Sequence, residues 1–335
     1  MTRAFATKSV IAASLLALMI PGLATAQDVV NSPYVVTGET GTAHIYPTPE
    51  LSRQIKAQQG VLPPSPALSY HGGPIMTGVN LYAIFWTPTK LQNGNPTSLT
   101  AKYESVAKQF LADYPYHGVA NNSTQYYSTT GGTHYFVGIG GLVASVVDTD
   151  PYPPSGCSDT VTPSNCITDA QLQAEIAKVM AAQKWTPALN KIFIVFTSTG
   201  EGSCFSSSST SCAYTSYCAY HSWFGSATSP TLYANMPYAN PTYCYAAGQH
   251  DPSGDIPSDA NVNVTSHEIT EATTDPELNA WWDSANGDEI GDLCAWIFGT
   301  ADWDSGKANQ NWNGHYYDLQ LEYDNHVSGC VKVGP

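Results

Sequence analysis

The sequence contains few positive charges. Its 335 residues include 12 lysines and arginines against 27 aspartates and glutamates, and the formal net charge at pH 7 is −15. Nucleic acids and anionic membranes attract proteins that carry a positive patch, so this balance argues against both as partners. Beyond the first 26 residues the chain also lacks a long apolar run, and we expect no membrane insertion.

Two common catalytic patterns are missing as well. No Gly-x-Ser-x-Gly segment and no glycine-rich phosphate loop is present, and no lone cysteine stands out. Nucleophilic catalysis and phosphate chemistry therefore have little support. Carboxylate pairs of the kind that glycosidases use are available, but the sequence does not set their separation. The candidates are Asp283, Asp288, Glu289 and Asp292.

The N-terminus has the pattern of an export signal. Arg3 and Lys8 precede an apolar run over residues 10–20, and small residues follow at 24–26. The run is too short to span a membrane, so it indicates a signal peptide over residues 1–26 with cleavage near Ala26. We therefore expect a secreted protein, extracellular or periplasmic.

Eight cysteines in an exported chain favour disulfide bonds over thiol chemistry. Cys157 and Cys166 form a short local pair, and Cys294 and Cys330 remain near the C-terminus. The even number permits four bridges, whose connectivity the sequence leaves open. Four further cysteines lie close together, but the C-x2-C spacing of a zinc site is absent from them. They are Cys204, Cys212, Cys218 and Cys244.

The chain divides into an N-terminal segment and one folded domain. Residues 27–66 are polar and contain several prolines, which predicts an extended arm or a removable pro-segment. Residues 67–335 form the expected domain, of mixed α+β class, with residues 200–258 as a disulfide-pinned loop region. We expect strands at 79–86, 135–147, 191–197 and 316–323, and helices at 99–113, 169–180 with Asp169 as N-cap, and 258–276.

The last of these helices contains the motif around which the functional hypothesis is built. His267 and Glu271 lie four residues apart, so both project from one face of a helix, and Glu268 follows His267. The pattern is close to H-E-x-x-H, in which two histidines bind zinc and the glutamate is the general base. Here a glutamate replaces the second histidine and still offers an oxygen ligand.

A catalytic zinc takes three protein ligands, so one more is needed. Glu289 lies 18 residues after Glu271, and we expect it to be the third ligand, with Asp292 orienting His267 through its second ring nitrogen. Glu277, ten residues after His267, and Asp292 itself remain alternatives. Two carboxylates and one histidine make a hard, anionic site, so another divalent metal is also compatible.

His221 is the best further candidate for a catalytic role, because it lies in a cysteine-rich segment where it is able to polarise a carbonyl. A hydrogen-bonded structural histidine is the plainer interpretation. His71 and His315, each beside a tyrosine, are weaker cases of the same kind.

An ordered set of segments resembles the EXORDIUM / phosphate-induced protein 1 family, best known as secreted plant cell-wall proteins. The resemblance begins with the Tyr70-His71-Gly72-Gly73-Pro74 segment and the strand at 80–86. It continues through 218–221, 259–263, His267-Glu268 with Glu271, 279–281 and 289–294. It implies a disulfide-bonded extracellular protein, and it favours Glu289 over Glu277 because Glu277 lies outside the family pattern. It implies no agreed reaction.

The sequence therefore predicts a zincin-like, secreted zinc metallopeptidase that acts on a protein or peptide substrate. His267, Glu271 and Glu289 would bind the metal, and Glu268 would act as base with His221 assisting. The alternative is a non-catalytic extracellular or cell-wall binding protein in which the same site is structural or vestigial. The 8 tryptophans and 21 tyrosines suit sugar stacking, although aromatic residues also fill β-rich cores.

Overall fold

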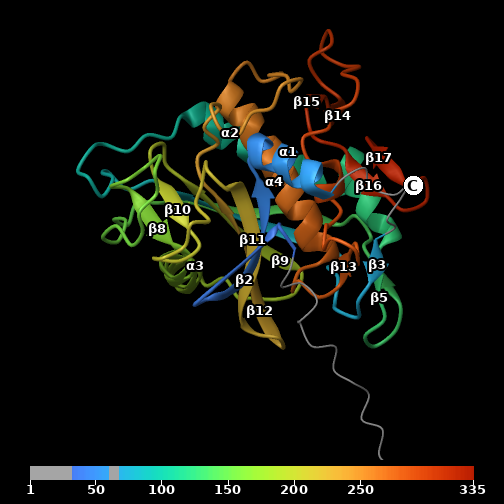
Figure 1. The fold of residues 1–335 in the computed structure, drawn as a ribbon, viewed down its shortest axis with the longest axis horizontal. Coiled ribbons are helices and arrows are strands. Elements are labelled where there is room, and N and C mark those ends of the chain that lie inside the picture. Colours follow the sequence, from blue (N-terminus) through green and yellow to red (C-terminus); the bar gives the residue numbers. More distant parts are fainter. Residues whose placement is uncertain (1–31, 60–67) are drawn as a thin grey trace, which may run out of the picture.

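A seven-stranded mixed sheet lies at the centre of the fold (Figure 1). The computed structural model describes residues 32–59 and 68–335. Along the sheet, β1, β2, β11 and β12 pair antiparallel, whereas β12, β9, β4 and β7 pair parallel. The strands in spatial order are β1 Val35–Gly38, β2 Gly41–Pro47, β11 Tyr217–Ser226, β12 Ser229–Met236, β9 Lys191–Thr197, β4 Val79–Trp86 and β7 Gly140–Asp148.

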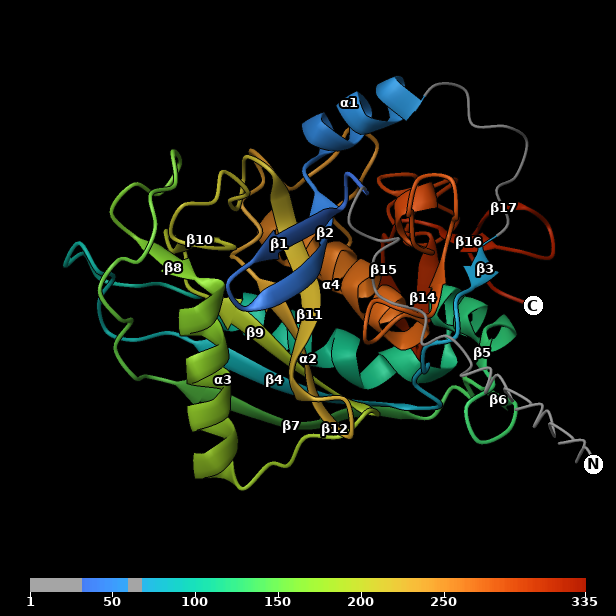
Figure 2. The same cartoon turned by 60° about the horizontal axis from the view of Figure 1, so that its bottom comes forward.

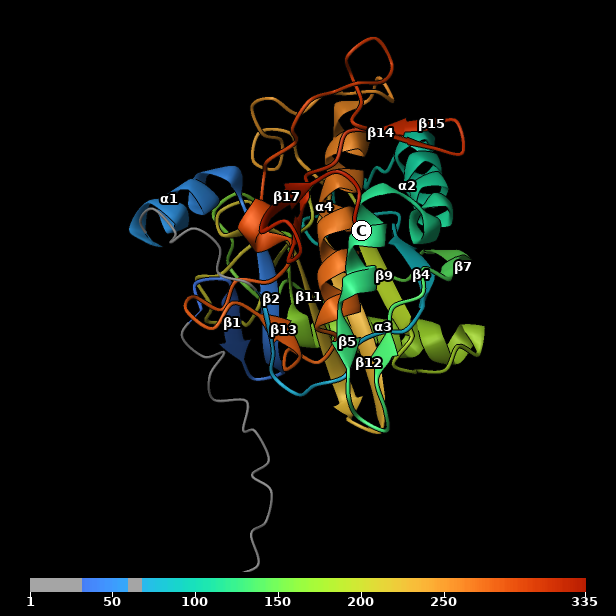
Figure 3. The ribbon, with the colours of Figure 1, turned by 90° about the vertical axis from the view of Figure 1, so that its right-hand side faces the viewer.

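Helices cover both faces of this sheet (Figure 2). Helices α2 (Ala101–Asp113) and α4 (Ile256–Thr274) pack against each other on one face, and α3 (Asp169–Gln183) lies on the other (Figure 3). Strands that are buried on both faces are continuously apolar, which is why β4 and β9 have the bounds that the sequence predicts. The arrangement confirms the predicted mixed α+β class.

Helix α4 is buried along almost its whole length, from Ser258 to Thr274. Asp255 caps its start by accepting a hydrogen bond from the backbone N–H of Ser258, and the helix stops before Pro276, as predicted. Its threonine hydroxyls donate to carbonyls one turn earlier in the helix; Thr265, for example, donates to the Asn261 carbonyl at 2.7 Å. The burial leaves its polar face directed into the protein, where a site can form.

The N-terminal segment differs from the extended arm that the sequence indicates. Within residues 32–59, β1 and β2 form a hairpin, β2 pairs with β11 inside the main sheet, and α1 (Pro49–Gln59) follows. The alternation of polar and apolar residues in β2 is short, and its proline-rich surroundings hide it. The signal peptide and the predicted start of the domain at residue 67 lie outside the described residues.

The segment 200–258 also differs from prediction, because it contains β11 and β12, two of the longest strands of the sheet. The first six residues of β11 are all buried, and α4 packs on one of its faces, so the alternation that marks a strand is absent. Two smaller predictions are wrong: Thr168, not Asp169, caps α3, and the expected strand at 316–323 is broken between β15 and β16.

Short elements complete the fold. They are β3 Ser69–Tyr70, β5 Tyr127–Ser128, β6 His134–Tyr135, β8 Cys166–Thr168, β10 Gly202–Cys204, β13 Trp281–Trp282, β14 Gln310–Trp312, β15 His315–Tyr317, β16 Glu322–Asp324 and β17 Gly329–Val331, with 3-10 turns η2 Tyr114–Tyr116, η3 Gly118–Gln125 and η4 Asp292–Cys294. In the described part of the chain, no helix is both long and apolar enough to cross a membrane.

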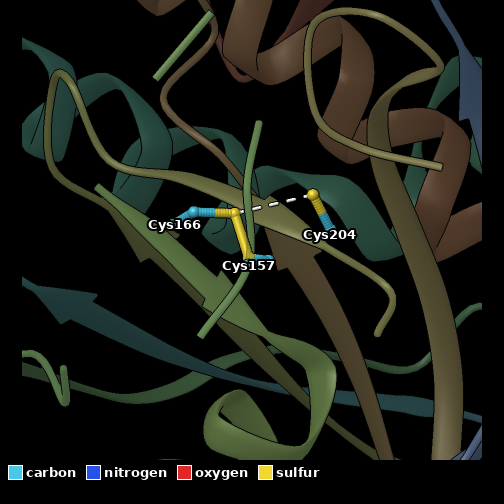
Figure 4. Close-up of side chains that lie close together, drawn as sticks. All are labelled: Cys157, Cys166 and Cys204. Carbon is cyan, nitrogen blue, oxygen red and sulfur yellow. Dashed lines mark hydrogen bonds between the residues drawn. A yellow bond between two sulfur atoms is a disulfide. The ribbon is translucent and has the colours of Figure 1, made fainter. Parts of the chain in front are cut away.

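All eight cysteines form disulfides, as predicted, and the set fits an extracellular protein. The pairs are Cys157–Cys166, Cys204–Cys212, Cys218–Cys244 and Cys294–Cys330. The first pair lies against the second, with 3.5 Å between the sulfurs of Cys166 and Cys204 (Figure 4). No thiolate is left for the four-cysteine zinc site that the sequence already disfavours.

Candidate metal centre

Three histidines from three separate elements surround Glu271 of α4. His267 is one turn earlier on the same helix, His44 comes from β2, and His221 comes from β11. His44 and His221 are direct partners in the β2–β11 register, so both side chains leave the sheet on the face that α4 covers. The packing of α4 on these two strands therefore builds the site.

The histidine nitrogens converge on one oxygen, Oε2 of Glu271. The distances are 3.0 Å from His267 Nε2, 3.3 Å from His44 Nδ1 and 3.7 Å from His221 Nδ1. Ligand atoms around a tetrahedral zinc with bonds of about 2.0–2.1 Å lie about 3.3–3.4 Å apart. The first two distances are close to this separation.

The loop after β13 adds two carboxylates. Asp292 Oδ2 lies 3.4 Å and Glu289 Oε1 3.7 Å from His44 Nε2, and Glu289 Oε2 lies 3.9 Å from His221 Nε2. The cluster contains two groups of three residues that each bring one ligand atom within 4.8 Å of the others, and both groups include Glu271. One is His44, Glu271 and Asp292, and the other is His221, Glu268 and Glu271.

These seven side chains are buried, none being more than 2% exposed. Several of their buried atoms have no hydrogen-bond partner, namely both nitrogens of His44, both oxygens of Glu271, Nε2 of His221 and of His267, and one oxygen each of Glu268, Glu289 and Asp292. An unpaired buried polar atom is costly, and buried charges normally pair or coordinate metals. A cation would satisfy these atoms together.

The electrostatics of the cluster also favour a bound cation. Burial, together with the neighbouring acidic groups, raises the pKa values of Glu268, Glu289 and Asp292 well above the ordinary range. Burial also acts on Glu271, but His267 and His44 hold the pKa of this carboxyl below its usual value. Among the described residues, no lysine or arginine forms an ion pair with these four carboxylates. Lys56 lowers the pKa of Asp292 electrostatically, but its ammonium donates to the Ala295 carbonyl and forms no ion pair with Asp292.

His267 is held in place by Gln320 rather than by Asp292. The Gln320 side-chain nitrogen lies 3.0 Å from His267 Nδ1 and donates to the Gly291 carbonyl, also at 3.0 Å. Asp292 lies 4.0 Å from Nε2, the nitrogen that faces Glu271, and accepts a hydrogen bond from the Glu289 backbone. Asp292 therefore lies on the side of the ring that faces Glu271, and Gln320, not Asp292, contacts the second ring nitrogen.

Two further features fix the geometry. The Tyr46 ring stacks on His267 with 3.9 Å between centroids. A methyl group on Gly291 would lie 2.5 Å from His267 Nδ1 and 2.9 Å from Glu271 Oε1, closer than any real contact. Glycine at 291 therefore lets the loop bearing Asp292 approach the helix, and the Cys294–Cys330 bridge anchors that loop.

The structure brings together most of the site residues expected from the sequence: His267, Glu268, Glu271, Glu289, Asp292 and His221. Glu277 lies beyond the end of α4, where its backbone carbonyl accepts a hydrogen bond from Trp223. His71 stacks on Trp282 and His315 pairs with Asp113 at 2.7 Å. His44 was not expected, because it lies in the segment interpreted as an arm; the polar-face alternation of Thr42, His44 and Tyr46 was the available signal.

Comparison with known proteins gives short matches only. Residues of this chain are 35% identical over 94 positions to Protein EXORDIUM-like 3 of Arabidopsis thaliana, covering 24% of this chain and 28% of that protein. Protein EXORDIUM-like 5 of the same plant is 36% identical over 70 positions, 19% of each chain. The matches therefore span less than a third of either relative. No protein-family model matches, and no solved structure shows significant similarity.

These similarities support a relationship to the EXORDIUM family. Together with the four disulfides, they fit an extracellular protein. Neither relative's name states a reaction.

Proposed function

We propose that the chain is a secreted, zinc-dependent peptidase, related to the EXORDIUM family as a bacterial-type member. The observation that carries this proposal is the convergence of three buried histidines on Glu271, whose carboxylate oxygens have no hydrogen-bond partner. Imidazole and carboxylate ligands together suit zinc better than the all-oxygen sets of calcium or magnesium. The helix-borne His-Glu motif beside a mixed sheet is the basis for the zincin-like assignment.

His44 and His267 are the proposed histidine ligands because their nitrogens are the two nearest to Glu271 Oε2, at 3.3 and 3.0 Å. With Glu271 they would give two imidazoles and one carboxylate, which is the composition of many catalytic zinc sites and leaves a fourth position open. Asp292, which forms a mutually close group with His44 and Glu271, is an alternative to His267. Glu289, the third ligand expected from the sequence, faces His44 and His221 on the same side of the centre and stays an alternative. Gln320 and Tyr46 hold the His267 ring in its orientation.

Glu268 is the proposed general base. Its Oε2 lies 3.2 Å from His221 Nδ1, and its Oε1 is buried without a partner. Burial and the negative charge of Glu271 raise the pKa of Glu268, which favours accepting a proton near neutral pH. Burial lowers the pKa of His221 to about 3, so His221 stays neutral and serves as a hydrogen-bonding partner of Glu268 or of a substrate oxygen.

The bound metal would lower the pKa of a water molecule and polarise the substrate carbonyl. The protein's contribution is to exclude bulk water, hold His267 and His44 at fixed positions, and place Glu268 beside the reacting water. Each of these contributions depends on the burial of α4 under the loop at 287–295.

The closed surroundings of the centre support a second candidate, a non-catalytic protein with a structural metal. Tyr34 is fully buried and stacks on His44, with 5.9 Å between the ring centroids, and Asp292, Asp288 and Glu271 act on its hydroxyl electrostatically. Ser32 bonds to the Gly287 carbonyl. Residues 32–34 thus cover the centre, and a structural zinc site is closed in this way. A peptidase requires this cover to move.

A cavity of about 350 Å³ marks the side from which a substrate would approach. Ser32 and Pro33 line one part of it, Trp282 and Gly287 another. Movement of residues 32–34 would join this cavity to the centre, because Gly287 is two residues from Glu289.

The experiment that separates the two candidates compares zinc-loaded wild type with Glu268→Gln and Glu277→Gln on a fluorogenic peptide library. The proposal predicts that Glu268→Gln retains zinc but loses about 10²-fold or more of the activity, while Glu277→Gln keeps it. If zinc-loaded wild type cleaves no peptide, the peptidase proposal is wrong and the structural metal site is the remaining candidate. Equal activity in Glu268→Gln would contradict the assigned base.

A further inference from the structure

A second cluster of carboxylates lies apart from the centre, where β7 ends against α3. Asp148 is the last residue of β7, Asp150 follows in the next loop, and Glu175 projects from α3. One oxygen from each lies within 4.8 Å of the others. The proposed peptidase does not use these residues.

Asp148 differs from an ordinary surface carboxylate because it is buried. The residue is only 7% exposed, and its Oδ2 is buried without any hydrogen-bond partner, although it belongs to this cluster. Its other oxygen accepts a hydrogen bond from the Asp150 backbone at 3.0 Å. A buried, unpaired carboxylate oxygen is costly unless a cation contacts it.

Lys178 neutralises the cluster only in part. Its ammonium lies 2.5 Å from Asp150 and 3.2 Å from Glu175, and about half of its side chain is exposed. One ammonium thus faces three carboxylates, and burial together with the charge of Asp148 raises the pKa of Glu175 to about 7. Because the lysine is long and half exposed, it can leave the cluster when a better cation binds.

The backbone that carries these carboxylates is fixed. The Trp86 indole donates to the Asp150 carbonyl at 2.8 Å, and the Thr87 N–H donates to the Asp148 carbonyl at 2.7 Å. Asp148 and Asp150 therefore keep their separation without a ligand, which lowers the ordering cost of binding.

We propose that Asp148, Asp150 and Glu175 bind a calcium ion that displaces Lys178. All donors are carboxylate oxygens, and calcium accepts six to eight oxygen ligands in flexible geometry. The half-exposed Asp150 leaves room for water to complete the shell. Imidazole is absent from the group, unlike at the buried centre, so the two sites select different metals. Bound calcium would join the edge strand β7 to α3 and stabilise that edge.

Terbium luminescence tests the site, because Tb³⁺ replaces Ca²⁺ and the neighbouring Trp86 would sensitise its emission. Metal-free wild type should show Tb³⁺ emission that Ca²⁺ at about 10⁻⁴–10⁻³ M displaces, the range of extracellular calcium modules. Asp150→Asn, a half-exposed position whose change spares the fold, should weaken Ca²⁺ binding about tenfold or more.

Lys178→Gln gives the sharper result. Loss of the competing ammonium should tighten Ca²⁺ binding several-fold, whereas Lys108→Gln, which breaks a comparable helical lysine–glutamate pair, should leave it unchanged. Ca²⁺ should also raise the melting temperature of wild type but not of Asp150→Asn. Emission that Ca²⁺ does not displace, or equal Ca²⁺ affinity in wild type, Asp150→Asn and Lys178→Gln, would overturn the proposal.

Discussion

His44 and His221 are direct partners in the antiparallel pairing of β2 with β11, and each places a ring nitrogen within 3.7 Å of Glu271 Oε2. They lie far apart in sequence, so the centre exists only once the N-terminal hairpin joins the sheet. Metal binding at such a site contributes to folding stability. The N-terminal segment is therefore part of the site, not an attachment to it.

His44→Ala should weaken zinc binding about tenfold or more, because it removes a nitrogen 3.3 Å from Glu271 Oε2. His326→Ala, at an exposed histidine outside the centre, is the matched control and should leave affinity unchanged. Competition with a chromophoric chelator measures both. If His44→Ala binds zinc as tightly as wild type, His44 is not a metal ligand.

Gly291→Ala should destabilise the protein by about 1–3 kcal/mol and loosen the metal, since its methyl group would overlap His267 and Glu271. Gly329→Ala, where a methyl group meets only one atom at 3.9 Å, is the control. Urea unfolding with and without zinc reports both effects. If Gly291→Ala matched the control, the close packing of the loop on α4 would be refuted.

Tyr34→Ala should release zinc to a chelator faster than wild type and raise peptidase activity, because it removes the ring that covers His44. Tyr34→Phe keeps the ring and should behave like wild type in both assays. Stopped-flow zinc transfer gives the rates. Identical release from all three proteins would show that residues 32–34 do not limit access.

Glu201 provides a test of pH dependence away from the centre. Burial raises the pKa of this carboxyl to about 8, against a smaller opposing effect of Gln92. The folded state therefore binds a proton more tightly than the unfolded state. The resulting stability is complete below about pH 4.5 and is lost as the pH rises toward 8, by up to about 1.4 kcal/mol per pH unit.

Glu201→Gln removes this titration. Its free energy of unfolding should resemble that of wild type near pH 5 and exceed it by a few kcal/mol at pH 8–9. Glu50→Gln, at an exposed helix position, should follow wild type throughout. Parallel curves for wild type and Glu201→Gln between pH 5 and 9 would exclude the raised pKa.

The sequence predicts the parts of the site that depend on local spacing. His267 and Glu271 face one way because they are four residues apart on α4, and β4 and β9 are evident because strands covered on both faces are uniformly apolar. His44 escapes such reasoning, since only the non-local β2–β11 pairing gives it a function. Gln320 could not be predicted for the same reason, because it lies 53 residues from His267 in sequence and meets it only in the folded protein.

The central claim is that the buried cluster around Glu271 binds a metal, and the metal content of purified, folded protein tests it most directly. Plasma emission analysis should find zinc bound to wild type in stoichiometric amount, with retention in Glu277→Gln and loss in Glu271→Gln. Folded wild type that binds no zinc or other divalent metal, even after incubation with excess, would contradict the account.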